Sequence, residues 1–227
     1  SRAVAEGMSK GVQYLFRKNK IDQLTGKGRL AGNGMVEVVD AAGEKKQYSA
    51  KNIILATGAR SKELPGLKQD GRKIIGYREA MSLEKQPESM VIVGSGAIGS
   101  EFACFYQTLG TSVTLVEFLP RIVPNEDEEV SKYLERSFKK MGMKIMTGSS
   151  VESAEIAGEK CLARIRTPKG EETVETDIIF SAVGVTPNLE DLGLETAGVG
   201  TDRGKVIVDE YYRTPVPGIF AIGDIVH

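Results

Sequence analysis

A glycine-rich turn lies near the middle of the chain. It runs from Gly94 through Gly96 to Gly99, with the spacing GxGxxG. The first glycine permits a tight turn, the second lets a phosphate approach the backbone, and the third lets a helix pack closely on a strand. A helix beginning here would also offer free N–H groups and a partial positive charge to an anion. The pattern predicts a site for the pyrophosphate of a dinucleotide.

An acidic residue follows at the distance that this chemistry needs. Glu117 lies eighteen residues after Gly99, where a carboxylate can accept hydrogen bonds from an adenosine ribose. A carboxylate suits the neutral diol of NAD and repels the 2′-phosphate of NADP. Arg121 could bind such a phosphate, but with Glu117 intact we interpret it as a surface charge. The sequence therefore favours NAD.

The elements that would position these groups occur in the required order. An apolar run over 90–93 predicts a strand, and apolar residues repeat every three or four positions from Ala97 to Leu109, which is typical of a helix. Residues 112–116 then predict a second strand that ends at Glu117. A GxGxxG turn alone is weak evidence, because such turns can be purely structural. Strand, turn, helix, strand and acid together favour a dinucleotide-binding unit.

The rest of the chain predicts a mixed α/β protein. We expect a helix over 2–19, antiparallel hairpins over 21–48, and a buried strand over 52–56. The acids at 126–129 are interpreted as the capped start of a helix rather than a metal site, with Val130, Leu134 and Phe138 as its buried face. Further strands are expected at 144–146, at 151–175 as a small antiparallel sheet, and at 177–182, 206–208 and 218–224.

Composition limits the possible functions. The 227 residues carry 30 Lys and Arg against 31 Asp and Glu, so no charge excess indicates nucleic acid or a membrane surface as a partner. Cys104 and Cys161 lie too far apart in sequence for a CxxC motif or a zinc site, and His227 is the single histidine. No apolar run reaches membrane-spanning length. The start at Ser1 rather than Met indicates a piece of a longer chain.

Four motifs in order carry a resemblance to a known family. They are Ala-Thr-Gly at 56–58, the glycine turn followed by Glu101, Ala-Val-Gly at 182–184 with Pro-Asn at 187–188, and Ala-Ile-Gly-Asp at 221–224. In this order they resemble the pyridine nucleotide-disulfide oxidoreductases. Within that family, residues 116–119 and 126–130 are most similar to the members that oxidise dihydrolipoamide. The resemblance covers essentially the whole chain.

The resemblance implies a fold and a domain division. The fold would be a Rossmann-like parallel sheet with an inserted antiparallel β-meander, in two FAD- and NAD-binding-type domains of which the FAD domain is incomplete. Residues 1–80 and 210–227 would belong to the FAD domain and 81–209 to the NAD domain. The family's FAD fingerprint, its redox CxxxxC pair and its C-terminal dimer domain with a His-Glu pair have no match here. His227 does not match that catalytic histidine.

Residue by residue, the resemblance also implies ligand contacts. Gly94, Gly96 and Gly99, with the amides of Ala97 and Ile98, would hold the pyrophosphate, and Glu117 the adenosine ribose. Gly184 would line the nicotinamide side. Glu101 would contact the carboxamide, although an acid there also suits the helix start. Thr57 and Gly58 would face the flavin, and in the Gly223-Asp224 turn Asp224 would bind the flavin ribityl chain, with a structural Gly-Asp turn as the alternative.

The implied parent enzyme passes electrons from dihydrolipoamide through a redox disulfide and FAD to NAD⁺. It would be a homodimer within a 2-oxo acid dehydrogenase complex, in the cytoplasm or the mitochondrial matrix of a eukaryote. This chain alone is expected to be inactive and to retain no FAD. Alternatives are another oxidoreductase of the family, such as an NADH oxidase or a mercuric or glutathione reductase, and a non-catalytic NAD-binding module.

Overall fold

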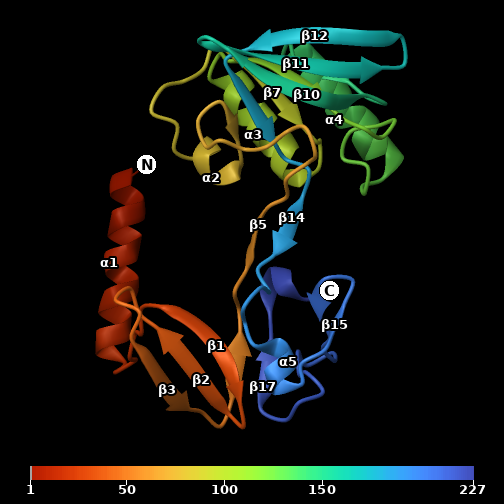
Figure 1. The fold of residues 1–227 in the computed structure, drawn as a ribbon. Coiled ribbons are helices and arrows are strands. Elements are labelled where there is room, and N and C mark those ends of the chain that lie inside the picture. Colours follow the sequence, from red (N-terminus) through yellow and green to blue (C-terminus); the bar gives the residue numbers. More distant parts are fainter. Residues whose placement is uncertain (1) are drawn as a thin grey trace. The chain divides into compact units, whose positions relative to one another are not determined.

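The computed structural model describes residues 2–227 and divides them into two compact units (Figure 1). The fingerprint unit comprises 59–186, and the flanking unit comprises the chain up to Gly58 together with 187–227. These divisions fall at 58/59 and 186/187, whereas the sequence placed them at 80/81 and 209/210. The difference arises because Ile74–Ile75 joins the sheet of the fingerprint unit and Val206 packs in the core of the flanking unit.

The fingerprint unit is built on a five-stranded parallel sheet with strand order β6-β13-β7-β8-β9. Strand β7 is central and pairs with β8 on one side and with β13 on the other, so the chain order reverses beside it. The sequence predicted every strand except β6. The bounds are β6 (Ile74–Ile75), β7 (Ser89–Val93), β8 (Ser112–Val116), β9 (Lys144–Met146) and β13 (Ile178–Ser181).

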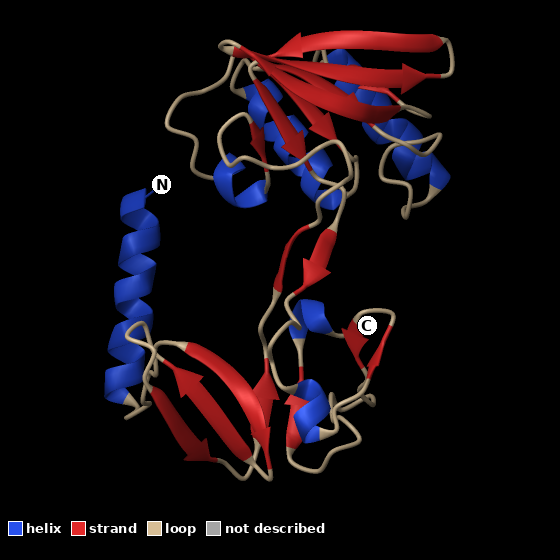
Figure 2. Cartoon of the chain, viewed as in Figure 1, coloured by secondary structure: helices blue, strands red, loops and turns tan. Residues whose placement is uncertain are grey.

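Alternating apolar residues bury both faces of this sheet. Met90 and Ile92 of β7 pack with the helices, whereas Val91 and Val93 face a second, antiparallel sheet. Side chains alternate between the two faces of a strand, so a continuous apolar run is expected where both faces are covered. The second sheet is a meander of β10 (Ser150–Ala157), β11 (Lys160–Thr167) and β12 (Gly170–Thr176), visible as the uppermost strands in Figure 2. The predicted parallel sheet with an inserted β-meander is confirmed.

The helices of this unit are α2 (Tyr77–Ala80), α3 (Ala97–Thr108) and α4 (Glu128–Lys140). The carboxylate of Asp127 accepts the N–H of Glu129 at 2.7 Å, which confirms the predicted capping by the acidic cluster. One part of the predicted buried face is wrong, because Val130 is 52% exposed. Leu134 is half-buried and Phe138 is buried, so the apolar contacts of this helix with the core come from its second and third turns.

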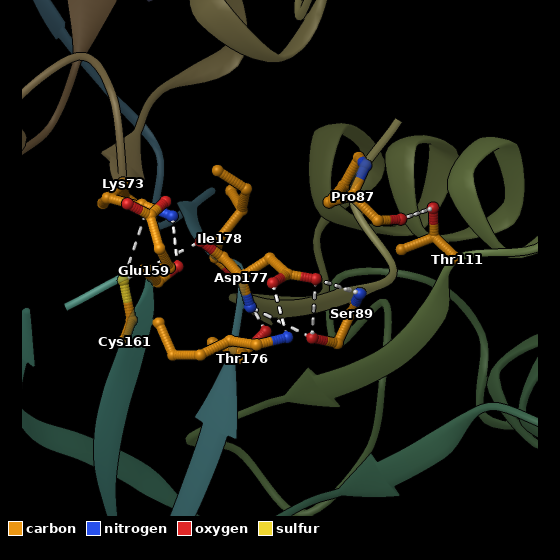
Figure 3. Close-up of polar contacts among 10 residues, drawn as sticks. Lys73, Pro87, Ser89, Thr111, Glu159, Cys161, Thr176, Asp177 and Ile178 are labelled. Carbon is orange, nitrogen blue, oxygen red and sulfur yellow. Dashed lines mark hydrogen bonds and ion pairs between the residues drawn. The ribbon is translucent and has the colours of Figure 1, made fainter. Parts of the chain in front are cut away.

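Polar contacts join the two sheets at the edge where the parallel strands begin (Figure 3). The Asp177 carboxylate accepts the backbone N–H of Ser89 at 2.9 Å and the Ser89 hydroxyl at 3.2 Å, and it pairs with Lys160 of β11 at 2.7 Å. Burial acts to raise the pKa of Asp177, but the hydrogen bonds from Lys160 and Ser89 outweigh it and hold this pKa below its usual value. These contacts fix the meander to the sheet.

The flanking unit holds an antiparallel sheet, a parallel pair and a small core. The sheet confirms the predicted hairpins, and the parallel pair joins β4 to β17. Its core contains Leu30, Leu55, Leu194 and Ile219. The elements are β1 (Lys27–Gly32), β2 (Met35–Val39), β3 (Lys45–Ser49), β4 (Ile53–Leu55), α5 (Leu194–Ala197), β15 (Thr201–Asp202), β16 (Lys205–Val206), β17 (Ile219–Ala221) and the 3₁₀ helix η1 (Gly223–Ile225). Strands β5 (Ala59–Ser61) and β14 (Val185–Pro187) form a further two-stranded pair.

Two elements of the flanking unit leave apolar surface uncovered. The predicted N-terminal helix is present as α1 (Arg2–Lys18), but none of its residues is buried. Strand β4 was expected to be buried, yet Ile54 is 63% exposed and only Leu55 on the opposite face is enclosed.

None of the helices formed by residues 2–227 combines the length and the apolar character that a membrane span needs.

Candidate functional site

A cavity of about 830 Å³ lies at the carboxyl edge of the parallel sheet in the fingerprint unit. Loops that follow β7, β8, β9 and β13 form it, so parts of the chain distant in sequence meet at one edge. The strand order reverses between β7 and β13, and open α/β sheets bind ligands at such a switch point. The lining residues are Leu64, Pro65, Val93–Ile98, Val116–Leu119, Ser149–Glu152 and Ala182–Gly184.

Two of the three glycines in the turn are required by the fold. Gly94 has a positive φ of 94°, and a Cβ there would lie 2.6 Å from the carbonyl oxygen of Ala182. A Cβ at Gly99 would lie 1.9 Å from the carbonyl oxygen of Gly94. Real Cβ atoms do not approach oxygen so closely, so a larger residue at either position would force the backbone of the strand-to-helix turn to shift. Both glycines therefore act as the sequence predicted, in the turn and in the helix–strand contact.

Gly96 is different, because the fold does not require it. Its φ is −62°, which any residue can adopt, and a Cβ there would meet no described atom within 4 Å. It lines the cavity and is the N-cap of α3, where it provides no side chain to cap the helix. The first-turn amides of α3, including those of Ala97 and Ile98, therefore have no capping side chain from Gly96, as an anion site at a helix start requires.

Glu117 lies directly beside this turn in the cavity wall and is 7% exposed. Its Oε2 accepts both the backbone N–H of Ser95 at 2.8 Å and the Ser95 hydroxyl at 2.6 Å. Its Oε1 accepts the backbone N–H of Leu119 at 2.8 Å. Three donors thus fix the carboxylate at the cavity wall, and Oε1, with one donor, retains accepting capacity for a ligand hydroxyl.

The loop after β8 also contacts the glycine turn through the backbone carbonyl of Ser95. The carbonyl of Ser95 accepts the backbone N–H of Val123 at 3.0 Å and the hydroxyl of Ser100 at 2.9 Å. Val123 has a positive φ of 40°, which is an outlier for a β-branched residue. Strain of this kind persists only where surrounding contacts determine the backbone. The turn and the loop that carries Glu117 therefore form one connected structure.

Charge around the cavity is acidic. Among the described residues, no Lys or Arg lines it, whereas Glu117 and Glu152 do. Arg121 lies outside, where its Nη2 donates to the carbonyls of Pro124 at 2.9 Å and Glu126 at 3.2 Å. This placement agrees with the interpretation of Arg121 as a residue that does not serve a phosphate in the cavity.

Of the other two residues predicted to contact the nucleotide, Gly184 lines the cavity and Glu101 does not. Gly184 lines the cavity with a positive φ of 102°, and a Cβ there would meet open space. Glu101 is exposed on α3 and does not line the cavity. Its predicted contact with a carboxamide stays a prediction.

The residues predicted to contact a flavin lie together in the flanking unit. Strands β4 and β17 are parallel and in register at Leu55 and Ala221, so the segments after them leave the same edge. Thr57 and Gly58 follow β4, and Gly223 and Asp224 follow β17. A Cβ at either glycine would meet open space, and Asp224 is exposed. Thr57 Oγ1 and its carbonyl are already bonded to Asn188, at 2.7 and 3.1 Å.

Sequence reasoning missed several residues of the cavity. Ser149 and Ser150 follow a predicted parallel strand and could have been found, because all parallel strands end at the same edge. Ser95 could have been noted as the one polar residue among the three variable positions of the turn. Leu64 and Pro65 could not have been found, because the sequence there predicts only a turn.

Both cysteines are free, Cys104 half-buried and Cys161 buried, and the part of the chain that the structure covers holds no cluster of metal ligands.

Comparison with known proteins agrees with this geometry. The family model described as pyridine nucleotide-disulphide oxidoreductase matches residues 3–227. Dihydrolipoyl dehydrogenases from Rhizobium etli and Zymomonas mobilis are each 42% identical to the chain over 99% of its length, which is 50% and 48% of those proteins. The chain thus spans about half the length of the curated relatives it matches.

Solved structures agree as well. LpdA from Mycobacterium tuberculosis superposes with a TM-score of 0.89 at 29% identity, over 99% of this chain and 50% of that one. The HOCl-induced flavoprotein disulfide reductase RclA from Escherichia coli shares the fold, with a TM-score of 0.81 at 22% identity over 97% of this chain and 51% of that one. With its glycine turn, its cavity and a family match across nearly all its residues, the chain belongs to the pyridine nucleotide-disulphide oxidoreductase family.

Proposed function

We propose that the cavity of the fingerprint unit binds NAD(H), with the pyrophosphate against the turn at Gly96. The conformation of Gly96 carries this proposal. Its neighbours Gly94 and Gly99 are glycine for steric reasons within the fold, whereas Gly96 faces open cavity in an ordinary backbone conformation. A side chain there would fill the space that a phosphate needs beside the α3 amides.

The cofactor is NAD rather than NADP in this proposal. The Glu117 carboxylate is held in place by three donors and can accept a ribose hydroxyl at Oε1. A 2′-phosphate at the same place would meet this carboxylate, with no cation of the cavity wall to offset the repulsion. Arg121 is turned away into its own loop.

We further propose that the segments after β4 and β17 contact FAD in the complete enzyme. Thr57, Gly58, Gly223 and Asp224 leave one edge of a parallel pair, and the two glycines have open space beside them. When bound, FAD supplies the redox chemistry that exchanges hydride with the nicotinamide. The residues of this chain orient the two cofactors, Gly184 by lining the nicotinamide end of the cavity and Asp224 by accepting hydrogen bonds from the flavin side chain.

The substrate of the complete protein would be dihydrolipoamide, as the names of the relatives indicate. Cys104 lies in α3 and Cys161 in β11, and the two form no disulfide with each other. We propose that the dithiol exchange of that reaction would occur on residues outside this chain. We propose that the chain alone is inactive and retains no FAD. A homodimer, membership of a 2-oxo acid dehydrogenase complex and a cytoplasmic location are parts of the same proposal.

Calorimetric titration of the chain with NADH and with NADPH tests the proposal. We expect NADH to bind more tightly, and Glu117→Ala to weaken NADH binding by about 1–3 kcal/mol because hydrogen bonds to a charged group are lost. Glu152→Ala is the matched control, because Glu152 is a second acid of the cavity wall that pairs with Arg166 and has no proposed ligand contact. Equal affinity for the two cofactors would contradict the role of Glu117, and no binding of either would contradict the site.

A further inference from the structure

Ser95, the second residue of the glycine turn, makes a contact that the GxGxxG pattern does not specify. Its side chain is fully buried, and its hydroxyl donates to Oε2 of Glu117 at 2.6 Å. Its own backbone N–H donates to the same oxygen at 2.8 Å. One residue of the pyrophosphate turn thus supplies two of the three hydrogen bonds to the carboxylate that faces the ribose position.

We propose that Ser95 is a positioning residue that fixes Glu117 and thereby sets the selectivity of the site for NAD over NADP. The inference rests on the proposed NAD(H) site and names a determinant of its specificity. Ser95 would not touch the cofactor itself, because its side chain is buried and its single hydroxyl proton is directed to Glu117.

Ser95 can affect selectivity because it opposes the rotation of Glu117 that a 2′-phosphate would require. A cofactor with a 2′-phosphate could be accommodated only if the Glu117 side chain rotated away, since no cation of the cavity wall offsets the repulsion. Rotation would break the bonds from Ser95 to Oε2 and from Leu119 to Oε1, and hydrogen bonds to a charged acceptor are among the stronger ones. The Ser95 hydroxyl therefore raises the cost of admitting NADP.

Ser95 is itself held rigidly. Its carbonyl accepts the N–H of Val123 and the hydroxyl of Ser100, so the backbone of the turn keeps its place when the side chain is changed. Removal of the hydroxyl alone should leave the backbone of the turn intact and remove one of the two hydrogen bonds to Oε2 of Glu117. A change in cofactor affinity without a loss of folding would then indicate a positioning role rather than a structural one.

The test uses Ser95→Ala in the chain of 227 residues, titrated with NADH and with NADPH. We expect NADH affinity to fall about three- to tenfold, with NADPH affinity unchanged or higher, so that the ratio of the two affinities falls. Ser131→Ala is the matched control, because Ser131 is equally buried and its hydroxyl donates to the carbonyl of Val123 rather than to Glu117. The control should change neither affinity by more than about twofold.

A double-mutant cycle with Glu117→Ala completes the test. If Ser95 acts through the carboxylate, Ser95→Ala should change NADH affinity less than about twofold once Glu117 is absent. A similar loss in both backgrounds, or an unchanged NADH-to-NADPH ratio in Ser95→Ala, would overturn the inference. If Ser95→Ala does not fold, Ser95→Gly replaces it, and failure of both to fold would assign Ser95 to stability and overturn the inference too. Absence of NADH binding by the unmodified chain would instead refute the site itself.

Discussion

A Cβ at position 99 would lie 1.9 Å from the carbonyl oxygen of Gly94, so the first turn of α3 rests directly on the end of β7. The two glycines permit this close approach of helix and strand. Gly96 lies between them in sequence but takes no part in this contact. The spacing GxGxxG thus combines two glycines that the fold requires with one that it does not require and that we propose serves a ligand.

Gly99→Ala should destabilise the fingerprint unit. The methyl group would force α3 away from β7, and overpacking of this kind costs about 1–3 kcal/mol or more. Thermal unfolding followed by circular dichroism measures the change. An unchanged melting temperature would contradict the close contact between the Gly94 carbonyl and α3.

Asp177→Asn should lower the free energy of unfolding at pH 7 by about 1–3 kcal/mol, because the charged acceptor of Ser89 and the partner of Lys160 is lost. The pKa of Asp177 is held below its usual value in the folded chain, so its contribution is complete above the unfolded pKa of about 4. The contribution is lost as pH falls through the lower, folded pKa. Urea unfolding of both proteins from pH 7 down to about pH 2 should show the difference narrowing in the acid range.

Glu155→Gln provides the control for that measurement. Glu155 lies in the same meander and faces Arg164 at 4.0 Å with both side chains exposed. Exposed pairs of this kind contribute about 0–1 kcal/mol. If Asp177→Asn costs no more than Glu155→Gln, the polar contacts at the amino edge of the sheet do not fix the meander as described.

Arg121→Gln should leave the affinities for NADH and NADPH unchanged within about twofold. Its guanidinium donates to the carbonyls of Pro124 and Glu126, so the change should cost about 1 kcal/mol of stability instead. Competition titrations with both cofactors, together with a melting curve, measure the two effects. A selective loss of NADPH binding would show that Arg121 reaches a 2′-phosphate.

Helix α1 should exchange its amide hydrogens faster than α3. It spans Arg2–Lys18 and buries none of these residues, and helices in proteins owe most of their stability to tertiary packing of an apolar face. Helix α3 packs against β7 and β8 through Ala103 and Tyr106 and should be protected. Hydrogen exchange read by mass spectrometry compares the two segments in one sample, and equal protection would mean that α1 is covered by a contact absent from the structure.

The sequence predicted the fingerprint unit well because its signals are local. The strand over 112–116 and the helix from Ala97 match the structure, and Gly94 and Gly99 have the geometry that their positions implied. Strand β6 was missed because Ile74–Ile75 is only two residues long and becomes a strand through its pairing with β13.

Burial and side-chain contacts were harder to predict, because they depend on distant parts of the chain. Val130 fits the apolar face of α4 by spacing, yet nothing covers the first turn on that side among residues 2–227. Ile54 lies in an apolar run that predicts a buried strand, but β4 is enclosed on one face only and Ile54 is on the exposed face. The contact of Ser95 with Glu117 joins a residue that the sequence did not single out to one that it did, and only the folded turn brings the hydroxyl to the carboxylate.

The most direct test of the central claim is Gly96→Val, with NADH affinity and melting temperature measured on the same protein. Valine can adopt the backbone conformation of Gly96, and a Cβ there meets no described atom within 4 Å, so the melting temperature should change by no more than about 2 °C. NADH affinity should fall at least about a hundredfold, because the side chain fills the space assigned to the pyrophosphate, and Gly96→Ala should show a smaller loss. Preserved NADH affinity in a Gly96→Val protein that folds would contradict the dinucleotide site.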